Sequence, residues 1–190
     1  MGKLDFIEVI PIRYYDRHQI KQYISESIEQ NYPDELSRQE GIYFYLMGFS
    51  DRRINVKAFR KKTLLNNVSG LYDEKNKVLL ALNEYKTITY MNSMILVHEL
   101  RHAIQDAHFN LSDLMGNYSD FDDRRLAVLS AIEGDATFIW LVINNFDSKV
   151  LTSTLNSDAL LSLSPIGNTS QLYRLPGILR HQMVGPYIQG

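Results

Sequence analysis

The feature that most constrains this chain is the hexapeptide Val-His-Glu-Leu-Arg-His at residues 97–102. Its two histidines, His98 and His102, are four residues apart, and on a helix such positions share one face. Neutral imidazole is a good zinc ligand, so the pair predicts two ligands of a metal site. Glu99 follows His98 directly, where its carboxylate could take a proton from water at the metal. The segment is therefore expected to be helical, with a third ligand supplied from elsewhere in the chain.

The surroundings of this motif favour a buried site. Ile95, Leu96, Val97 and Leu100 are apolar, and polar groups buried among apolar ones need a partner. Short motifs also arise by chance, and helical histidine pairs are often surface residues. The motif alone therefore leaves a metal-free helical scaffold open.

Glu133 is the strongest candidate for the third ligand. It lies inside a predicted helix over about 120–145 whose apolar residues recur at helical spacing. A buried carboxylate without a partner is costly, so Glu133 should contact a cation, and zinc is the obvious one. An ion pair with Arg101 or Arg125 is the alternative. The apolar stripe comprises Leu129, Ile132, Ala136, Ile139, Trp140 and Ile143.

His108 is a competing third ligand. It falls where metzincin metalloproteases place the last histidine of HExxHxxGxxH, and Met115 follows where a Met-turn would be sought. Those enzymes need glycine at the position of Gln105, where the chain leaves the helix, whereas glutamine is a helix former. In an unbroken helix His108 lies ten positions after His98, about 80° off its face. We therefore expect His108 to point away from the metal.

The composition limits the class of protein. The chain has 190 residues, which suits a single domain with a substantial core. A net charge of −2 gives no basic field for nucleic acid, and the lack of cysteine leaves only histidine and carboxylate as zinc ligands. No apolar run approaches the ~20 residues of a membrane span, and the N-terminus does not resemble a signal peptide. We expect a soluble domain, either cytoplasmic or exported with its signal absent from this chain.

Patterning predicts a mostly helical chain with a small sheet. Residues 6–12 are expected to form a strand, and a capping box of Asp16 and Gln19 to start a helix that ends near Gln30. Further helices are expected over about 33–47, 55–66 and 89–108, with a turn-rich link at 112–118. Lys57, Arg60, Lys61 and Lys62 are expected to form a solvated helix face.

Two apolar runs at 68–72 and 77–82 flank a polar turn and predict a β-hairpin just before the histidine helix. We expect its second strand to matter most, because an exposed strand edge beside the metal could pair with an extended peptide backbone. The alternative is that the hairpin only covers the core.

The runs HELRHAIQDAHF and LAVLSAIEGDAT resemble the HELxHALQDQHF and ALxEGDA motifs of a family of bacterial and archaeal gluzincin-type zinc metallopeptidases. VSGLYDEKNKVLLAL is similar to that family's hairpin, AGFYDPETxxLYV, and MVGPYIQG to its FPYxxG element. The resemblance spans residues 68–190, and the chain departs from it at Ala107 and at Val184-Gly185.

The resemblance implies zinc as the cofactor, His98, His102 and Glu133 as its ligands, and Glu99 as the general base. Tyr187, in the last motif, could donate to the oxyanion formed on a carbonyl, although it could equally pack on the core. Residues 147–170 are expected to form a loop with a short helix near 158–161, followed by a helix over about 175–183. The chain stops within the last motif, so we expect the C-terminal segment to be cut short.

The sequence therefore predicts an α+β, mostly helical, zincin-like domain over residues 1–190. Its parts would be a scaffold (1–67), a catalytic hairpin with helices (68–146) and a C-terminal segment (147–190). We expect a zinc metalloendopeptidase that acts on a peptide or protein, with Gln105, Asp106 or Asp135 orienting the ligands and Asp106 placed best. The alternative is a catalytically silent metal-binding domain that serves as a sensor or adaptor.

Overall fold

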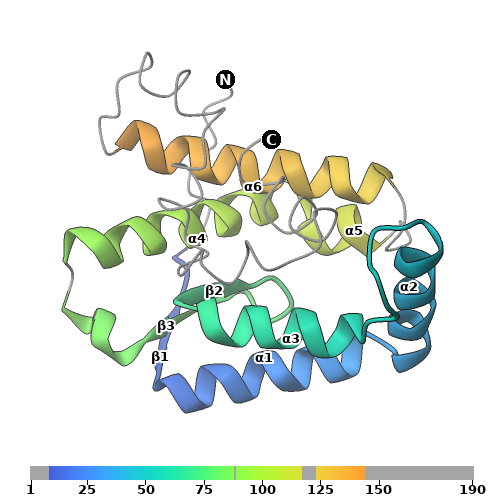
Figure 1. The fold of residues 1–190 in the computed structure, drawn as a ribbon. Helices are drawn as coiled ribbons and strands as arrows, with labels where there is room; N and C mark the ends of the chain where they lie inside the picture. Colours follow the sequence, from blue (N-terminus) through green and yellow to red (C-terminus); the bar gives the residue numbers. More distant parts are fainter. Residues whose placement is uncertain (1–8, 88, 117–122, 144–190) are drawn as a thin grey trace.

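The computed structural model describes residues 9–87, 89–116 and 123–143 (Figure 1). In this part the chain is mostly helical, with a three-stranded sheet of order β1-β3-β2. The sheet lies between α1 and α3 on one side and α4 and α6 on the other (Figure 1). The α+β, mostly helical class predicted from the sequence is confirmed, and the expectations for residues 144–190, Tyr187 among them, lie outside the described residues.

The central strand β3 (Val78–Leu82) carries the core on both of its faces. Successive strand residues point to opposite faces, so β3 reads as a continuous apolar run when both faces are covered. Leu80 and Leu82 pack against Ile20 of α1, while Leu79 and Ala81 pack against Leu96 of α4. The sheet thereby fixes where the histidine helix lies.

The first strand differs from the prediction. β1 (Ile12–Tyr15) runs parallel to β3, from Ile12 opposite Leu79 to Tyr15 opposite Leu82, instead of covering residues 6–12. Val9 is exposed and outside the strand, and residues 6–8 are not described. The β-branched residues suggested the earlier position, but the partner strand fixes the register, and Pro11 has no N–H to donate.

The hairpin is confirmed, but the role expected for its second strand is wrong. β2 (Gly70–Asp73) pairs antiparallel with β3, which also pairs with β1 and is fully buried. A central strand has no free edge, so β3 cannot add a peptide backbone. The edge on the side of the histidine helix belongs to β2, and no other described strand pairs with it.

Local capping signals define the N-terminal helices. Asp16 and Gln19 form the expected capping box of α1 (Arg17–Asn31), and the Asn55 side chain caps α3 (Val56–Asn67). The expected helix near 33–47 is α2 (Asp34–Leu46). Each capping side chain accepts a hydrogen bond from a backbone N–H that the helix leaves without an internal partner.

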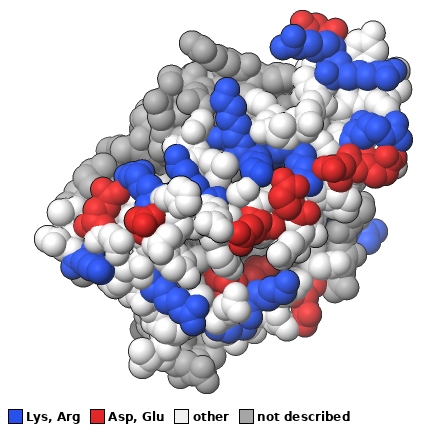
Figure 2. Space-filling model, turned by 90° about the horizontal axis from the view of Figure 1, so that it is seen from below, with Lys and Arg blue, Asp and Glu red and all other residues white. Residues whose placement is uncertain are grey.

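The basic residues of α3 do not form a purely solvated face. Lys57 is only 7% exposed, and its ammonium pairs with Glu29 of α1 and Asp34 of α2. Arg60 pairs with the buried Glu40 of α2 at 2.9 Å. Figure 2 shows basic and acidic side chains interspersed on this side of the molecule. The prediction is therefore wrong for Lys57, because tertiary contacts supplied carboxylates that helix patterning could not indicate.

After the short 3-10 helix η1 (Asn83–Lys86), α4 (Tyr90–Phe109) and α6 (Asp123–Ile143) form the second helical layer, and both were expected. The link expected at 112–118 is instead partly helical, because α5 (Leu111–Gly116) begins where the Leu111 N–H donates to Asp106.

Among the described helices, only α6 has the length and hydropathy of a membrane span, and a core helix can reach the same values. α6 packs against α4 through Glu133 and Asp135, so the described residues contain no clear membrane span.

Candidate metal centre

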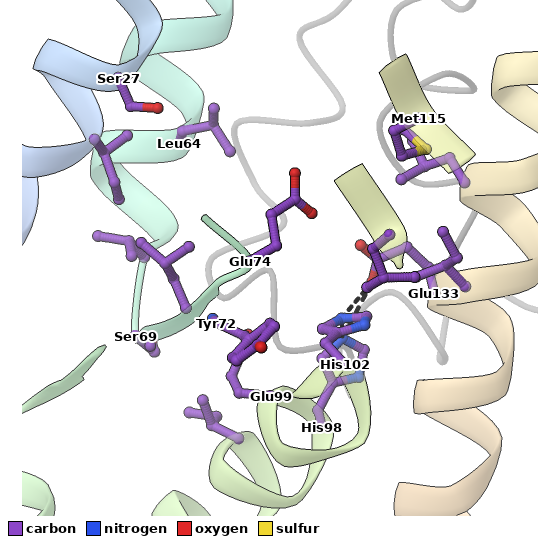
Figure 3. Close-up of a pocket in the computed structure, with 18 of the residues that line it drawn as sticks. Ser27, Leu64, Ser69, Tyr72, Glu74, His98, Glu99, His102, Met115 and Glu133 are labelled. Carbon is purple, nitrogen blue, oxygen red and sulfur yellow. Dashed lines mark hydrogen bonds and ion pairs between the residues drawn. The ribbon is translucent and has the colours of Figure 1, made fainter. Parts of the chain in front are cut away.

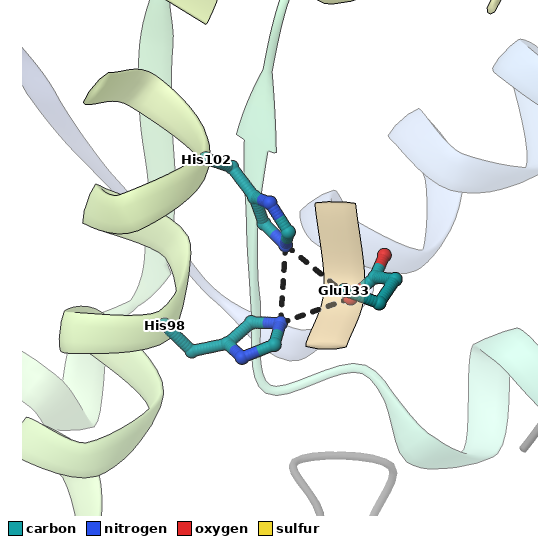
Figure 4. Close-up of side chains that lie close together, drawn as sticks. All are labelled: His98, His102 and Glu133. Carbon is teal, nitrogen blue, oxygen red and sulfur yellow. Dashed lines mark hydrogen bonds and ion pairs between the residues drawn. The ribbon is translucent and has the colours of Figure 1, made fainter. Parts of the chain in front are cut away.

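His98 and His102 on α4 face Glu133 on α6 across a short gap (Figure 4). The His98 Nε2 lies 3.0 Å from the His102 Nε2 and 3.1 Å from the Glu133 Oε2, and the His102 Nε2 lies 3.4 Å from the same oxygen. Ligands at about 2.0–2.1 Å from a tetrahedral zinc are separated by roughly 3.3 Å. The three atoms therefore have the spacing of three corners of a zinc tetrahedron, and they form a group that could hold a metal ion.

The charges at this triangle are set by the contacts of its members with one another, which outweigh the effect of burial. Burial alone would lower the pKa of His102, but the hydrogen bond and charge of Glu133 outweigh it and raise the pKa to about 9. Burial would raise the pKa of Glu133, but hydrogen bonds from His102 and His98 lower it to about 2. Without metal, the triangle thus holds an ionised carboxylate and a protonated imidazole. A bound cation would take the place of that proton.

The tautomer of His102 follows from the orientation of Gln105. The Gln105 amide nitrogen donates to the Ile132 carbonyl at 2.9 Å and to the Asp135 carboxylate at 2.7 Å. Both are acceptors, so the amide oxygen must be the atom that lies 2.9 Å from the His102 Nδ1. That nitrogen therefore carries a proton, which leaves the Nε2 lone pair for a metal once the second proton has gone.

Two of the three expected orienting residues take part in this chain of hydrogen bonds. Gln105 contacts the imidazole of His102, and Asp135 contacts Gln105. The Arg101 guanidinium pairs with Asp135 through two bonds of 2.7 and 3.1 Å, which fixes the carboxylate. The sequence indicated both residues but not the role of Arg101.

Asp106, predicted to be the best-placed orienting residue, has another role. Its buried carboxylate accepts from the Tyr72 hydroxyl at 2.7 Å, from the Lys77 ammonium and from the Leu111 N–H. The helix does place Asp106 one turn after His102, as the spacing implied. The His102 ring, however, turns toward α6, whereas Asp106 lies where α4 meets the hairpin, so the prediction for Asp106 is wrong.

Glu99 lies beside the triangle without belonging to it (Figure 3). The backbone N–H of Tyr72, on β2, donates to the Glu99 Oε2 at 2.8 Å. This bond occupies one carboxylate oxygen and fixes the side chain against the edge strand, while the second oxygen has no hydrogen bond to a described residue. The motif did not single out Tyr72, because the contribution comes from its backbone.

The structure places the alternative third ligand, and the alternative partners of Glu133, outside the triangle. α4 continues unbroken through Gln105, so His108 is exposed on the last turn, outside the triangle, as its helical position predicted. Arg101 pairs with Asp135 and not with Glu133. Arg125 donates to the carbonyl of Met115. Among the described residues, the three proposed ligands His98, His102 and Glu133 lie together, and the competing residues lie outside this group.

The triangle opens into a cleft of about 490 Å³, a size typical of ligand sites (Figure 3). α1 and α3 form one wall, α5 and α6 the other, and β2 with α4 lines the space between them. The lining is mainly apolar, with three carboxylates, Glu74, Glu99 and Glu133, and one arginine, Arg125.

Comparisons with protein-family models, with curated proteins and with solved structures found no match for this chain. What the chain does must therefore be inferred from its residues and their geometry.

We predict that Glu133→Ala weakens zinc binding more than about 100-fold, since loss of even an outer-shell partner costs about 10–100-fold. His108→Ala should leave the affinity unchanged, because that residue lies away from the triangle. Competition with a chromogenic chelator gives both dissociation constants. Strong weakening by His108→Ala alone would identify a metzincin-like ligand set.

Zinc binding should depend on pH. In the metal-free protein the pKa of His102 is raised to about 9, so the imidazole is protonated at neutral pH and must lose a proton when metal binds. The apparent association constant, corrected for the chelator's own protonation, should rise about 10-fold per pH unit between about pH 6.5 and 8.5 and level off above pH 9. An association constant that does not change over this range would show that no proton is displaced.

Gln105→Met should weaken zinc binding about 10–100-fold by removing the acceptor that fixes the His102 tautomer. Gln39→Met is the matched control, because Gln39 is exposed on α2 and far from the site in the sequence. Equal affinities for both variants would show that Gln105 does not orient the ligand.

Proposed function

We propose that this chain is a zinc-dependent metallopeptidase of gluzincin type that hydrolyses peptide bonds. The observation that carries the proposal is the triangle of His98, His102 and Glu133 beside a separate, fixed carboxylate, Glu99. Three protein ligands suit a catalytic zinc, which keeps its fourth position for water or substrate. Glu133 as the third ligand is what distinguishes a gluzincin-type site from a metzincin.

The donor set fits zinc. Two neutral imidazoles and a carboxylate are ordinary zinc ligands, and a chain without cysteine offers no thiolate alternative. The second ring nitrogen of His102 donates to Gln105, as metal-binding histidines usually do. When bound, zinc supplies Lewis acidity, which polarises a carbonyl group and lowers the pKa of water.

Glu99 is the proposed general base. Its Oε2 is held by the Tyr72 N–H, so its other oxygen can accept a proton from the attacking water. As the C–O bond forms and the C–N bond breaks, Glu99 passes this proton to the leaving amine, which balances the hydrolysis. A carboxylate next to the ligands that is not itself a ligand favours an enzyme over a silent metal-binding module.

The edge of β2 is the proposed surface for the substrate backbone. The Tyr72 N–H points away from β3, and alternate residues of an antiparallel strand point the same way, so the Gly70 N–H and C=O also face outward. An extended peptide can form main-chain hydrogen bonds there. Gly70 lets β2 lie close to α4, since an added Cβ would lie 3.3 Å from the Ile95 Cγ2.

Glu99→Gln separates an enzyme from a metal-binding module. The variant should keep about one zinc per chain, because Glu99 is not a ligand. Its hydrolysis of an unfolded protein should fall about 10²–10⁴-fold, because an amide cannot take the proton. Zinc content and hydrolysis are measured on the same preparations.

Glu84→Gln is the control for the loss of one negative charge, since Glu84 is exposed and pairs only with Arg17 among the described residues. Equal hydrolysis by wild type and Glu99→Gln would rule out Glu99 as the base. A zinc-loaded wild type without hydrolysis would favour the silent metal-binding module.

A further inference from the structure

The cleft contains a carboxylate that the proposed chemistry does not use. Glu74 follows β2 directly, at the start of the hairpin turn, and lines the same cleft as Glu99 and Glu133. Figure 3 shows its side chain extending from the end of the strand into the space between Ser27 and Leu64 on one side and Met115 on the other.

Glu74 differs from the other acidic groups around it. Glu133 contacts both histidines, Glu99 accepts from the Tyr72 N–H, and Asp73 accepts from Tyr23 and from Asn76. Glu74 has no hydrogen bond or ion pair with any described residue, and it is half-buried. A half-buried carboxylate is better stabilised by a cation than by incomplete hydration. No described residue of the cleft pairs with Glu74, so a bound ligand would have to supply the cation.

The position of Glu74 sets its distance from the reacting bond. The Tyr72 N–H fixes Glu99, and Glu74 lies two residues further along the chain. Two residues of chain span at most about 7 Å, so Glu74 lies within that distance of Tyr72, just beyond the end of β2. A peptide lying along β2 would place a residue near Glu74 about two positions from the bond beside Glu99.

The walls near Glu74 suit a long cationic side chain. Leu64 and Met115, which lie on either side of Glu74 in Figure 3, line this part of the cleft with apolar groups. Lysine and arginine pack their methylene stems on such surfaces while the charged end reaches a polar partner. Arg125 is the only lysine or arginine among the described residues that line the cleft, and it lies on α6 and donates to the Met115 carbonyl.

We propose that Glu74 is a specificity-determining residue that selects substrates with a cationic group about two residues from the cleaved bond. The group is a lysine or arginine side chain, or a free α-amino group when the substrate begins there. This inference rests on the proposed peptidase function, of which it names the substrate class.

The test uses peptides identical except for Lys, Gln or Glu at one position, scanned from three residues before to three after the cleaved bond. Wild type should cleave the Lys peptide about 10-fold faster than the Gln peptide, by kcat/KM, at one position, as one charge-assisted contact allows. Glu74→Gln should bring this ratio to about 1, and Glu74→Lys should favour the Glu peptide. N-acetylation of a peptide that begins at this position distinguishes the two sources of charge, because it removes only the α-amino group.

Glu26→Gln is the matched control, because it removes the same charge from the exposed face of α1 and should keep the wild-type ratio. A ratio of about 1 at every position in wild type, or a ratio that survives Glu74→Gln, would overturn the proposal.

Binding to the zinc-loaded Glu99→Gln protein tests Glu74 separately from the peptidase function. A labelled Lys peptide should bind about 10-fold more tightly than the Gln peptide, and adding Glu74→Gln should abolish the difference. If wild type cleaves no peptide but this difference is found, the peptidase function fails and the role of Glu74 stands. Equal binding of both peptides to Glu99→Gln overturns the role of Glu74, whatever the hydrolysis shows.

Discussion

The contact between α4 and α6 at Glu133 is the interaction on which the rest of this structure depends. The Glu133 carboxylate contacts the imidazoles of His98 and His102. Its burial requires a positive charge, either a cation bound between the three groups or a proton on one of the imidazoles. Beneath this contact, Gln105 and Asp135 join the same two helices by hydrogen bonds, and Arg101 holds Asp135 in place. Polar contacts therefore fix both helices, and three of the groups involved, His98, His102 and Glu133, form the candidate metal centre.

The hairpin connects this helix pair to the sheet. Tyr72 holds α4 at two points, through its N–H to Glu99 and through its hydroxyl to Asp106, and the carboxylate of Asp106 also receives the N–H that begins α5. Burial and then the Asp106 carboxylate raise the pKa of Tyr72, so its hydroxyl remains a donor at neutral pH. Because β2 is an edge strand, Tyr72, which fixes the proposed base, also borders the surface that we propose for a substrate.

The N-terminal helices form the opposite wall of the cleft, and ion pairs and close packing hold them together. Cations of α3 pair with carboxylates of α1 and α2, and Gly41 lets α2 approach the chain so closely that an added Cβ would lie 2.2 Å from the Ile54 carbonyl oxygen. On these packed helices, Ser27 of α1 and Leu64 of α3 line the cleft.

The sequence by itself determined whatever depends on neighbours along the chain. Capping side chains such as Asp16 and Asn55 begin helices through bonds three residues away, and the i, i+4 spacing of His98 and His102 places both on one face. It also indicated Glu133, because a carboxylate in an apolar stripe needs a partner. Only the tertiary structure decided which strand is central, that Lys57 is buried, and that Gln105 rather than Asp106 reaches His102. Each of these depends on a residue from another element, and helical or strand periodicity carries no information about which element that will be.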